Sequence, residues 1–413
     1  AGAPRDAAPP DRLRPRLAVM PFAAGEQAGP GGGPGGALGD MLADALARTL
    51  SGSHLLDVIS LMSARRVDAR ARVVAHIRER LDCDVVIFGD YVTDGPTLRV
   101  QVEVVEARSG RLLAAREDGA PLSDFLAGEA RLTAEMAGAI GRTVTDRATG
   151  LARGAPLETI ESHALLLAAT DLLFRVSRPE FVAARRLLDE LAERRPGSAT
   201  IHAWRSLWHI LSATGYYGED DLDAGSAARA AAARALELDP EDPFALTIDG
   251  MVHTMLLDRF DIAEARYDAA LTLNPSAALA WVMRGAQRAF TGAGAEAVAA
   301  TSRARQLSPL DPYQHFYEAV SASAHLAAGE PEEALALTER ALARDPLYPS
   351  TLRAKAVALQ LLGREEEARA AVGALLRAAP GSRARDYLAR HPACAYPTGR
   401  AWAEALRAAG LPD

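Results

Sequence analysis

Cysteine is nearly absent from this chain of 413 residues: Cys83 and Cys394 are the only two, and they lie in distant regions. Two cysteines exclude a disulfide framework and a four-cysteine zinc site. No apolar run reaches the roughly 18–20 residues that a membrane-spanning helix needs. Lysine occurs once, as Lys355, and the formal net charge is -8. This balance gives no reason to expect direct contact with nucleic acid or with a membrane by this chain.

Motifs of the common enzyme classes are missing as well. Lys355 does not follow a glycine, so there is no Walker loop, and neither H-E-x-x-H nor G-x-S-x-G occurs. Cys83 is expected to be a buried small apolar residue, because the sequence indicates no base beside it. The acidic run over 219–223 lacks the spacing of a calcium loop. We therefore predict no catalytic residue, no metal and no cofactor.

One glycine pattern resembles a dinucleotide-binding loop. Gly31, Gly33 and Gly36 have the spacing G-x-G-x-x-G between a predicted strand and a predicted helix, with Asp57 about 20 residues further on. A phosphate-binding turn must leave its strand at once, whereas residues 23–30 separate this strand from the first glycine. Pro34 also removes a backbone donor. We interpret the segment as a surface loop.

Hydrophobic patterns up to about residue 150 indicate a small α/β domain over 16–150, after a linker over 1–15. The linker is rich in proline, arginine and alanine, so we expect further chain before it. Period-two alternation is clearest where Leu98, Val100, Val102 and Val104 point one way. The predicted order is βαβαβββα. Strands are expected over 17–22, 55–59, 84–92, 97–106 and 111–116, and helices over 37–50, 68–82 and 122–150.

Beyond Pro156 the signal is a helical repeat. Prolines that end helical stretches recur at 196, 240, 275, 309, 346 and 380, with gaps of 44, 35, 34, 37 and 34 residues. A tetratricopeptide unit is a helix–turn–helix of about 34 residues. The clearest unit covers 278–309, with Trp281 and Gly285 in its first helix. The longer gap contains an insertion near 213–225.

Small residues at fixed distances before these prolines support the same register. Each proline defines two positions, 12 and 5 residues before it. Both positions are alanine in four of the six units. Small side chains are needed where neighbouring helices cross closely. Gly292, Gly329 and Gly363 mark the turns between the two helices of their units. We predict about six tetratricopeptide units over 157–380 and C-terminal capping helices over 381–413. The fold class is α+β: a small α/β domain followed by an all-α superhelix.

The first helix of each tetratricopeptide unit lines a concave groove in proteins with this repeat. The resemblance places several polar and apolar side chains there, together with two tyrosines on the insertion. On the helix over 201–212, three of them share one face because they are spaced i, i+3 and i+7. We predict a groove for a protein or peptide partner. Its expected residues are His202, Arg205, His209, Tyr216, Tyr217, Val282, Ala286, Arg353 and Gln360.

The segments LAVMPF, LDCDVVIFGDYV and VEVVEARSGRLLAARE, in that order, resemble the TolB-amino-terminal-like α/β domain. The resemblance to this domain followed by tetratricopeptide repeats extends from about residue 16 to 412. Such a pair commonly lies C-terminal to an effector domain in bacterial signalling proteins. The effector is a class III adenylate or guanylate cyclase, or a winged-helix DNA-binding domain.

The resemblance implies a non-catalytic regulatory or sensor module whose effector domain precedes this chain in a parent protein. Two alternatives are the C-terminal region of a cyclase and that of a winged-helix transcriptional regulator. A stand-alone enzyme that uses the glycine loop is a further alternative. We expect a cytoplasmic location, or a periplasmic one if the parent protein has a membrane helix before Ala1. The identity of the ligand and the oligomeric state stay open.

Overall fold

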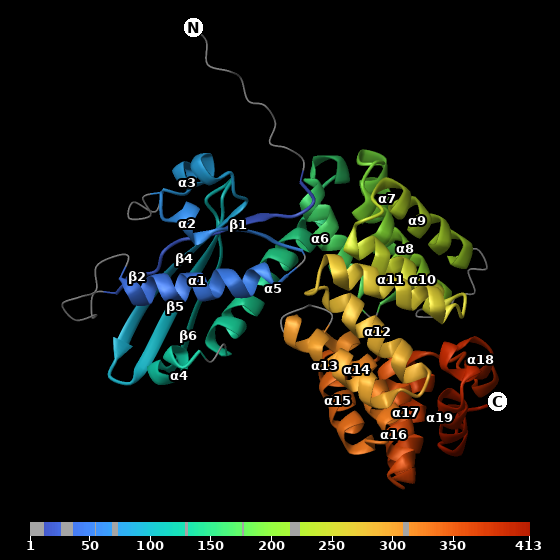
Figure 1. The fold of residues 1–413 in the computed structure, drawn as a ribbon. Helices are drawn as coiled ribbons and strands as arrows, with labels where there is room; N and C mark the ends of the chain where they lie inside the picture. Colours follow the sequence, from blue (N-terminus) through green and yellow to red (C-terminus); the bar gives the residue numbers. More distant parts are fainter. Residues whose placement is uncertain are drawn as a thin grey trace. The chain divides into compact units, whose positions relative to one another are not determined.

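The computed structural model describes residues 12–25, 36–53, 55–67, 73–128, 131–175, 177–214, 224–308 and 314–413. The chain divides into two compact bodies, Ala1–Asp171 and Leu172–Asp413. A small sheet region is followed by a long series of helices, so the fold class is α+β (Figure 1). Among the described residues, no helix is both long and apolar enough to cross a membrane.

The N-terminal body is built on one sheet, in which the described strands have the order β3-β1-β4-β5-β6, with β2 also paired to β4. The first three strands of this order are parallel, whereas β4, β5 and β6 form antiparallel hairpins. Leu98, Val100, Val102 and Val104 are at most 3% exposed, as their alternation predicts. The strands are β1 (Arg16–Val19), β2 (Ala23–Ala24), β3 (Asp57–Ile59), β4 (Val85–Asp94), β5 (Thr97–Glu106) and β6 (Leu112–Pro121).

Two predicted elements of this body differ in the structure. The first strand ends at Val19, and β2 follows separately after Pro21, which has no N–H to donate. The helix predicted over 122–150 is interrupted between Leu126 and Arg131, where Gly128 has a φ of 86°. A left-handed residue ends a helix, and glycine adopts this conformation without a steric penalty. The helices are α1 (Ala37–Ser51), α2 (Leu61–Ala64), α3 (Val74–Leu81), α4 (Leu122–Leu126) and α5 (Arg131–Gly154).

The C-terminal body is a series of antiparallel helix pairs. Helix α6 (Ser162–Leu173) crosses the boundary of the two bodies, so its pairing with α7 (Arg178–Arg194) as a first repeat stays a prediction. Five pairs follow, each with a first and a second helix. They are α8 (Ala199–Ala213) with α9 (Ala224–Leu238), α10 (Pro243–Met255) with α11 (Phe260–Leu273), α12 (Ala278–Phe290) with α13 (Gly294–Leu307), α14 (Gln314–Ala328) with α15 (Pro331–Arg344), and α16 (Pro349–Leu361) with α17 (Glu365–Ala378).

The three turn glycines have the conformation that their place in the repeat requires. Gly292, Gly329 and Gly363 have φ values of 86°, 78° and 72°. After each of them, the next N–H donates to a carbonyl five residues earlier, as in Ala293 to Arg288. Gly285 is tight for another reason: a Cβ there would lie 2.5 Å from Cγ2 of Thr301 on the second helix. The glycines thus set both the turn and the helix crossing.

The helices of the array form two layers with different spacing. Consecutive first helices, from α8 to α16, pack closely on one another, and each second helix packs on the first helix of the next repeat. Among the described residues, consecutive second helices do not pack closely on each other. A stack that is tight on one side and spread on the other is curved, with the tight side inside. We call the surface of the first helices the inner face.

Candidate binding face of the repeats

Three of the predicted groove residues on α8 make contacts within the repeat array. Nε of Arg205 donates to Oδ1 of Asp189 on α7 at 3.1 Å. Nε2 of His202 lies 3.0 Å from the carbonyl oxygen of Pro196. His209 is 8% exposed, with its ring edge-on to Trp208 at 5.0 Å. Arg205 thus contacts the preceding helix, and a binding role for these three residues stays a prediction.

The other predicted residues fall into three groups. Tyr216 and Tyr217 lie outside the described residues, as do Gly31 and Gly33 of the glycine pattern and the acidic run over 219–223. Val282 and Ala286 on α12 are at most 3% exposed. Arg353 and Gln360 are only partly buried and lie together on α16. Of these three groups, only the last offers polar side-chain atoms among the described residues.

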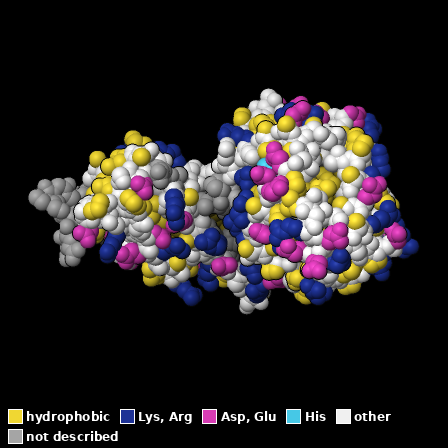
Figure 2. Space-filling model, turned by 90° about the horizontal axis from the view of Figure 1, so that it is seen from below, with side chains coloured by type: hydrophobic (Ala, Val, Ile, Leu, Met, Phe, Trp, Pro, Cys, Tyr) yellow, Lys and Arg dark blue, Asp and Glu magenta, His cyan; other side chains and the backbone are white. Residues whose placement is uncertain are grey.

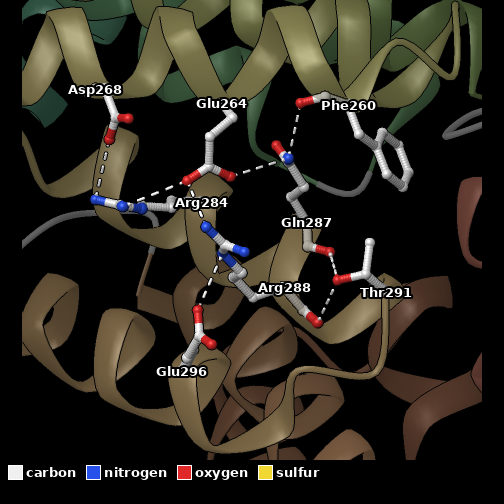
Figure 3. A network of polar contacts seen from close by, with 8 residues as sticks. All are labelled: Phe260, Glu264, Asp268, Arg284, Gln287, Arg288, Thr291 and Glu296. Atoms are coloured by element: carbon white, nitrogen blue, oxygen red, sulfur yellow. Dashed lines mark hydrogen bonds and ion pairs between the residues drawn. The ribbon is translucent and has the colours of Figure 1, made fainter.

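A polar network joins two neighbouring repeats between α11 and α12 (Figure 3). Glu264 on α11 accepts hydrogen bonds from Nη2 of Arg288 at 2.6 Å and from Nε2 of Gln287 at 3.2 Å, and Nη2 of Arg284 lies 3.3 Å away. The same amide of Gln287 also donates to the carbonyl oxygen of Phe260 at 2.9 Å. The network therefore fixes the start of α11, whose first residue is Phe260.

Replacing Glu264 with glutamine is expected to destabilise the array by about 1–2 kcal/mol, because one carboxylate serves three donors. Its side chain is 24% exposed, which lowers the effect below that of a fully buried network. Glu296→Gln is the matched control, since Glu296 is 66% exposed and pairs only with Arg288 among the contacts in Figure 3. Urea unfolding followed by circular dichroism measures both. Equal losses in the two variants would contradict this role.

The C-terminal segment, residues 384–413, is seated on the inner face. It consists of α18 (Ala384–Arg390), a 3₁₀ turn η2 (Pro392–Ala395) and α19 (Pro397–Ala408). Helix α19 packs on α16 and α12, and η2 packs on α12; both α12 and α16 are first helices of their pairs (Figure 1). The predicted capping helices therefore cover the part of the inner face that α12 and α16 form.

Ring contacts join this segment to the array. Tyr396 stacks on Phe260 with ring centroids 5.4 Å apart and an interplanar angle of 10°. His391 meets Phe290 edge-on at 5.0 Å. The guanidinium of Arg353 lies 6.0 Å from the centroid of Tyr387. Aromatic pairs of this kind each contribute about 0.5–1.5 kcal/mol beyond the apolar area they bury.

The segment is also closed on itself. The N–H of Ala384 donates to the carbonyl oxygen of Pro412 at 2.7 Å, which joins its two ends. Nη1 of Arg400 on α19 donates to the carbonyl oxygens of Cys394 and Ala395 in η2. A Cβ at Gly399 would lie 2.2 Å from the backbone of Ala393, so η2 and α19 are in direct contact. Residues 384–413 thus form a helical hairpin with its own internal contacts.

Burial affects the pKa of two groups where the C-terminal segment contacts the array, His391 and Arg353. Burial, and then the charge of Arg353, lowers the pKa of His391 to about 3. The ring is neutral at pH 7, and its Nδ1 accepts a hydrogen bond from the N–H of Ala393 at 3.2 Å. Burial lowers the pKa of Arg353, which keeps its charge at neutral pH because its ordinary value is far above 7. At this contact the charged Arg353 therefore lies near the neutral His391.

The N-terminal body contains two features that the sequence did not indicate. Ligating atoms of Asp84, Glu161 and His163 lie within 4.8 Å of one another. Asp84 already accepts from the N–H of Arg16 at 2.7 Å, and Glu161 pairs with Arg108 at 3.3 Å. Only tertiary structure joins residues so far apart in the chain. A cavity of about 390 Å³ also lies between β5, β6 and α5.

Cys83 gives no sign of nucleophilic chemistry. It is 2% exposed, and burial followed by the charge of Asp84 raises the pKa of its thiol to about 11. A thiol with this pKa is protonated at neutral pH, whereas a reactive cysteine requires a thiolate.

Acidic and basic side chains are interspersed over the face seen in Figure 2, so this face has no large area of one charge sign.

A family model described as tetratricopeptide repeat matches residues 325–390, from the end of α14 through α18. The C-terminal region contains tetratricopeptide repeats. Solved structures similar to this chain include a thermophilic tetratricopeptide protein of Thermus thermophilus (19% identity, 44% of this chain and 91% of that chain, TM-score 0.35). Another is Pseudomonas aeruginosa pilF (20% identity, 45% and 82%, TM-score 0.35). Yeast Tom70 is similar at 16% identity (62% and 55%, TM-score 0.35). No curated protein matches the chain.

Proposed function

We propose that the chain is a non-catalytic regulatory module whose tetratricopeptide repeats bind a segment of a partner protein on the inner face. Proteins with these repeats commonly mediate protein–protein interactions, and the curved stack provides an extended surface for them. The observation that carries the proposal is the C-terminal segment. Its rings meet Phe290 and Arg353 on the inner face and Phe260 at the start of the second helix α11, which supports binding of a helical peptide with aromatic side chains there.

The N-terminal body is proposed to be a TolB-amino-terminal-like domain, on the sequence resemblance and on the mixed sheet with its long β4–β5–β6 hairpins. The parent protein is proposed to have an effector domain on the N-terminal side, either a class III cyclase or a winged-helix DNA-binding domain. In that arrangement the repeats bind the signal, and the effector responds to it. The cytoplasm is the compartment proposed for such a protein.

The binding proposal is tested with the chain's own segment supplied as a peptide. The test uses a variant of the chain with Tyr387→Ala and Tyr396→Ala. These substitutions remove the ring contacts of Tyr396 with Phe260 and of Tyr387 with Arg353 and His391, and they change no residue of the array. A fluorescein-labelled peptide of residues 384–413 is then titrated, and binding is followed by fluorescence anisotropy. We expect saturable binding that Phe290→Ala weakens at least tenfold, because Phe290 lies on the inner face. A scrambled peptide that binds equally well would refute peptide recognition by this face.

A further inference from the structure

The last repeat differs from its neighbours at two positions of the inner face. Arg353 lies ten residues before the turn glycine Gly363, and the residues ten before Gly292 and Gly329 are Val282 and Ala319. Both of these are apolar and at most 4% exposed. Three residues before the same glycines, Gln360 corresponds to Ala289 and Leu326. One repeat thus places a cation and an amide where the others have apolar side chains.

Neither polar group has a hydrogen bond or an ion pair with the C-terminal segment among the described residues, although the ring of Tyr387 lies against the guanidinium of Arg353. Among the described residues, Arg353 has no ion pair, and its hydrogen bond goes to the neutral Oγ of Ser350 at 2.9 Å. Oε1 of Gln360 is buried and has no hydrogen-bond donor in the described part of the chain. An unpaired guanidinium and an unsatisfied amide oxygen both cost free energy when they are removed from water. The C-terminal segment is therefore an imperfect occupant of this part of the face.

The segment is joined to α17 by a short connection and has internal contacts of its own. Its ends are joined to each other by the bond from Ala384 to Pro412, and η2 and α19 are packed together. Residues 379–383 link it to α17, and within them a Cβ at Gly381 would meet no atom within 4 Å. The segment contacts the array through aromatic rings, and these contacts can separate without breaking an ion pair. Release therefore uncovers Arg353, against which the ring of Tyr387 lies in the seated segment.

We propose that the C-terminal segment is a built-in competitor on the inner face, displaced by a partner segment that carries an aromatic side chain and a carboxylate. The carboxylate pairs with Arg353, and a backbone N–H of the partner donates to Oε1 of Gln360. The aromatic side chain takes the place of His391 or Tyr396 against Phe290 or Phe260. This inference rests on the proposed function, since it specifies the partner of the same face.

The experiment uses three fluorescein-labelled peptides of residues 384–413: the natural sequence, His391→Glu and His391→Gln. His391 is chosen because the charge of Arg353 acts on it in the seated segment. The chains are the natural chain of 413 residues, the release variant with Tyr387→Ala and Tyr396→Ala, and both of these with Arg353→Gln. Arg385→Ala is the matched control in α18, because the side chain of Arg385 is 74% exposed.

We expect the release variant to bind each peptide at least tenfold more tightly than the natural chain, because its own segment competes less. The His391→Glu peptide should bind at least tenfold more tightly than the His391→Gln peptide, and Arg353→Gln should abolish this difference. Hydrogen exchange over residues 384–409 should speed up in the release variant and, with the His391→Glu peptide added, in the natural chain. The Arg385→Ala chain should behave like the natural one.

Equal affinity for the natural chain and the release variant, or unchanged exchange of residues 384–409 in the release variant, would overturn the competitor. A preference for the acidic peptide that survives Arg353→Gln would overturn the role of Arg353. Both results leave peptide binding by the face intact. In contrast, fast exchange of the segment with no binding of any peptide would overturn the proposed function itself, so the two failures are distinguishable.

Discussion

Replacing Tyr267 with alanine is expected to cost roughly 3–5 kcal/mol of the stability of the repeats, the range observed for large aromatic side chains in cores. Tyr267 is completely buried on α11. Its ring packs so closely on Gly250 of α10 that a Cβ added to Gly250 would lie 2.5 Å from Cε1 of Tyr267. Its removal leaves a cavity between the two helices of one repeat. The loss should spread to both neighbouring repeats, because each repeat is stabilised by contacts with the next.

The control for this substitution is Tyr267→Phe, which keeps the ring and removes only the hydroxyl. That hydroxyl lies 2.9 Å from Oγ1 of Thr254, which is itself fully buried. We expect a loss of about 1 kcal/mol, the usual contribution of one neutral hydrogen bond. Urea unfolding followed by far-ultraviolet circular dichroism gives both values. A loss below about 1 kcal/mol for Tyr267→Ala would show that the repeat does not depend on this ring.

Mild acid is expected to release the C-terminal segment from the inner face. The pKa of His391 is lowered to about 3 by burial and by Arg353, whereas an exposed histidine has a pKa of about 6.5. Between these values the released state binds more protons than the seated state. The free energy that favours the seated segment over the released one is therefore largest above about pH 6.5, and it decreases as the pH falls toward 3. Protonation also removes the lone pair of Nδ1 that accepts from Ala393.

The expected size of the effect at about pH 5.5 is about 1.4 kcal/mol, or a tenfold shift toward the released state. Hydrogen exchange over residues 384–409, corrected for the intrinsic effect of pH, measures it. His391→Gln should remove the dependence, because the amide does not titrate. His76→Gln serves as the control at an exposed histidine of α3. An equal pH dependence in the natural chain and in His391→Gln would contradict the assignment.

A second buried histidine, His315, also titrates in acid, so hydrogen exchange must be measured separately for each region. Burial, and then the charge of Arg344, lowers the pKa of His315 on α14 to about 4. Its ring is 6% exposed and lies edge-on to Tyr348 at 5.4 Å. Acid therefore also weakens the packing of α14, by the same sign argument. Exchange within α14 reports His315, whereas exchange over 384–409 reports His391.

Much of the fold follows from short-range patterns. The alternation in β5 and the glycines at the repeat turns depend on geometry within one or two elements, so they can be recognised from the residues alone. Arg353 and Gln360 were predicted to line the groove; both belong to α16, and their role in binding stays a prediction. The predicted face of α8 shows the limit of this approach. Helical spacing groups His202, Arg205 and His209, but it does not tell which neighbouring helix the group meets.

What the sequence determined by itself is the helical array, because a period of about 34 residues with small residues at helix crossings allows few other packings. Only the tertiary structure decided what lies on the inner face. The segment over 384–413 returns to α12 and α16 through contacts across a long sequence separation, such as Tyr396 with Phe260. Such contacts depend on the shape of the assembled stack, which no local pattern encodes. The same holds for Arg353, whose lack of an anionic partner among the described residues becomes visible only when its neighbours are in place.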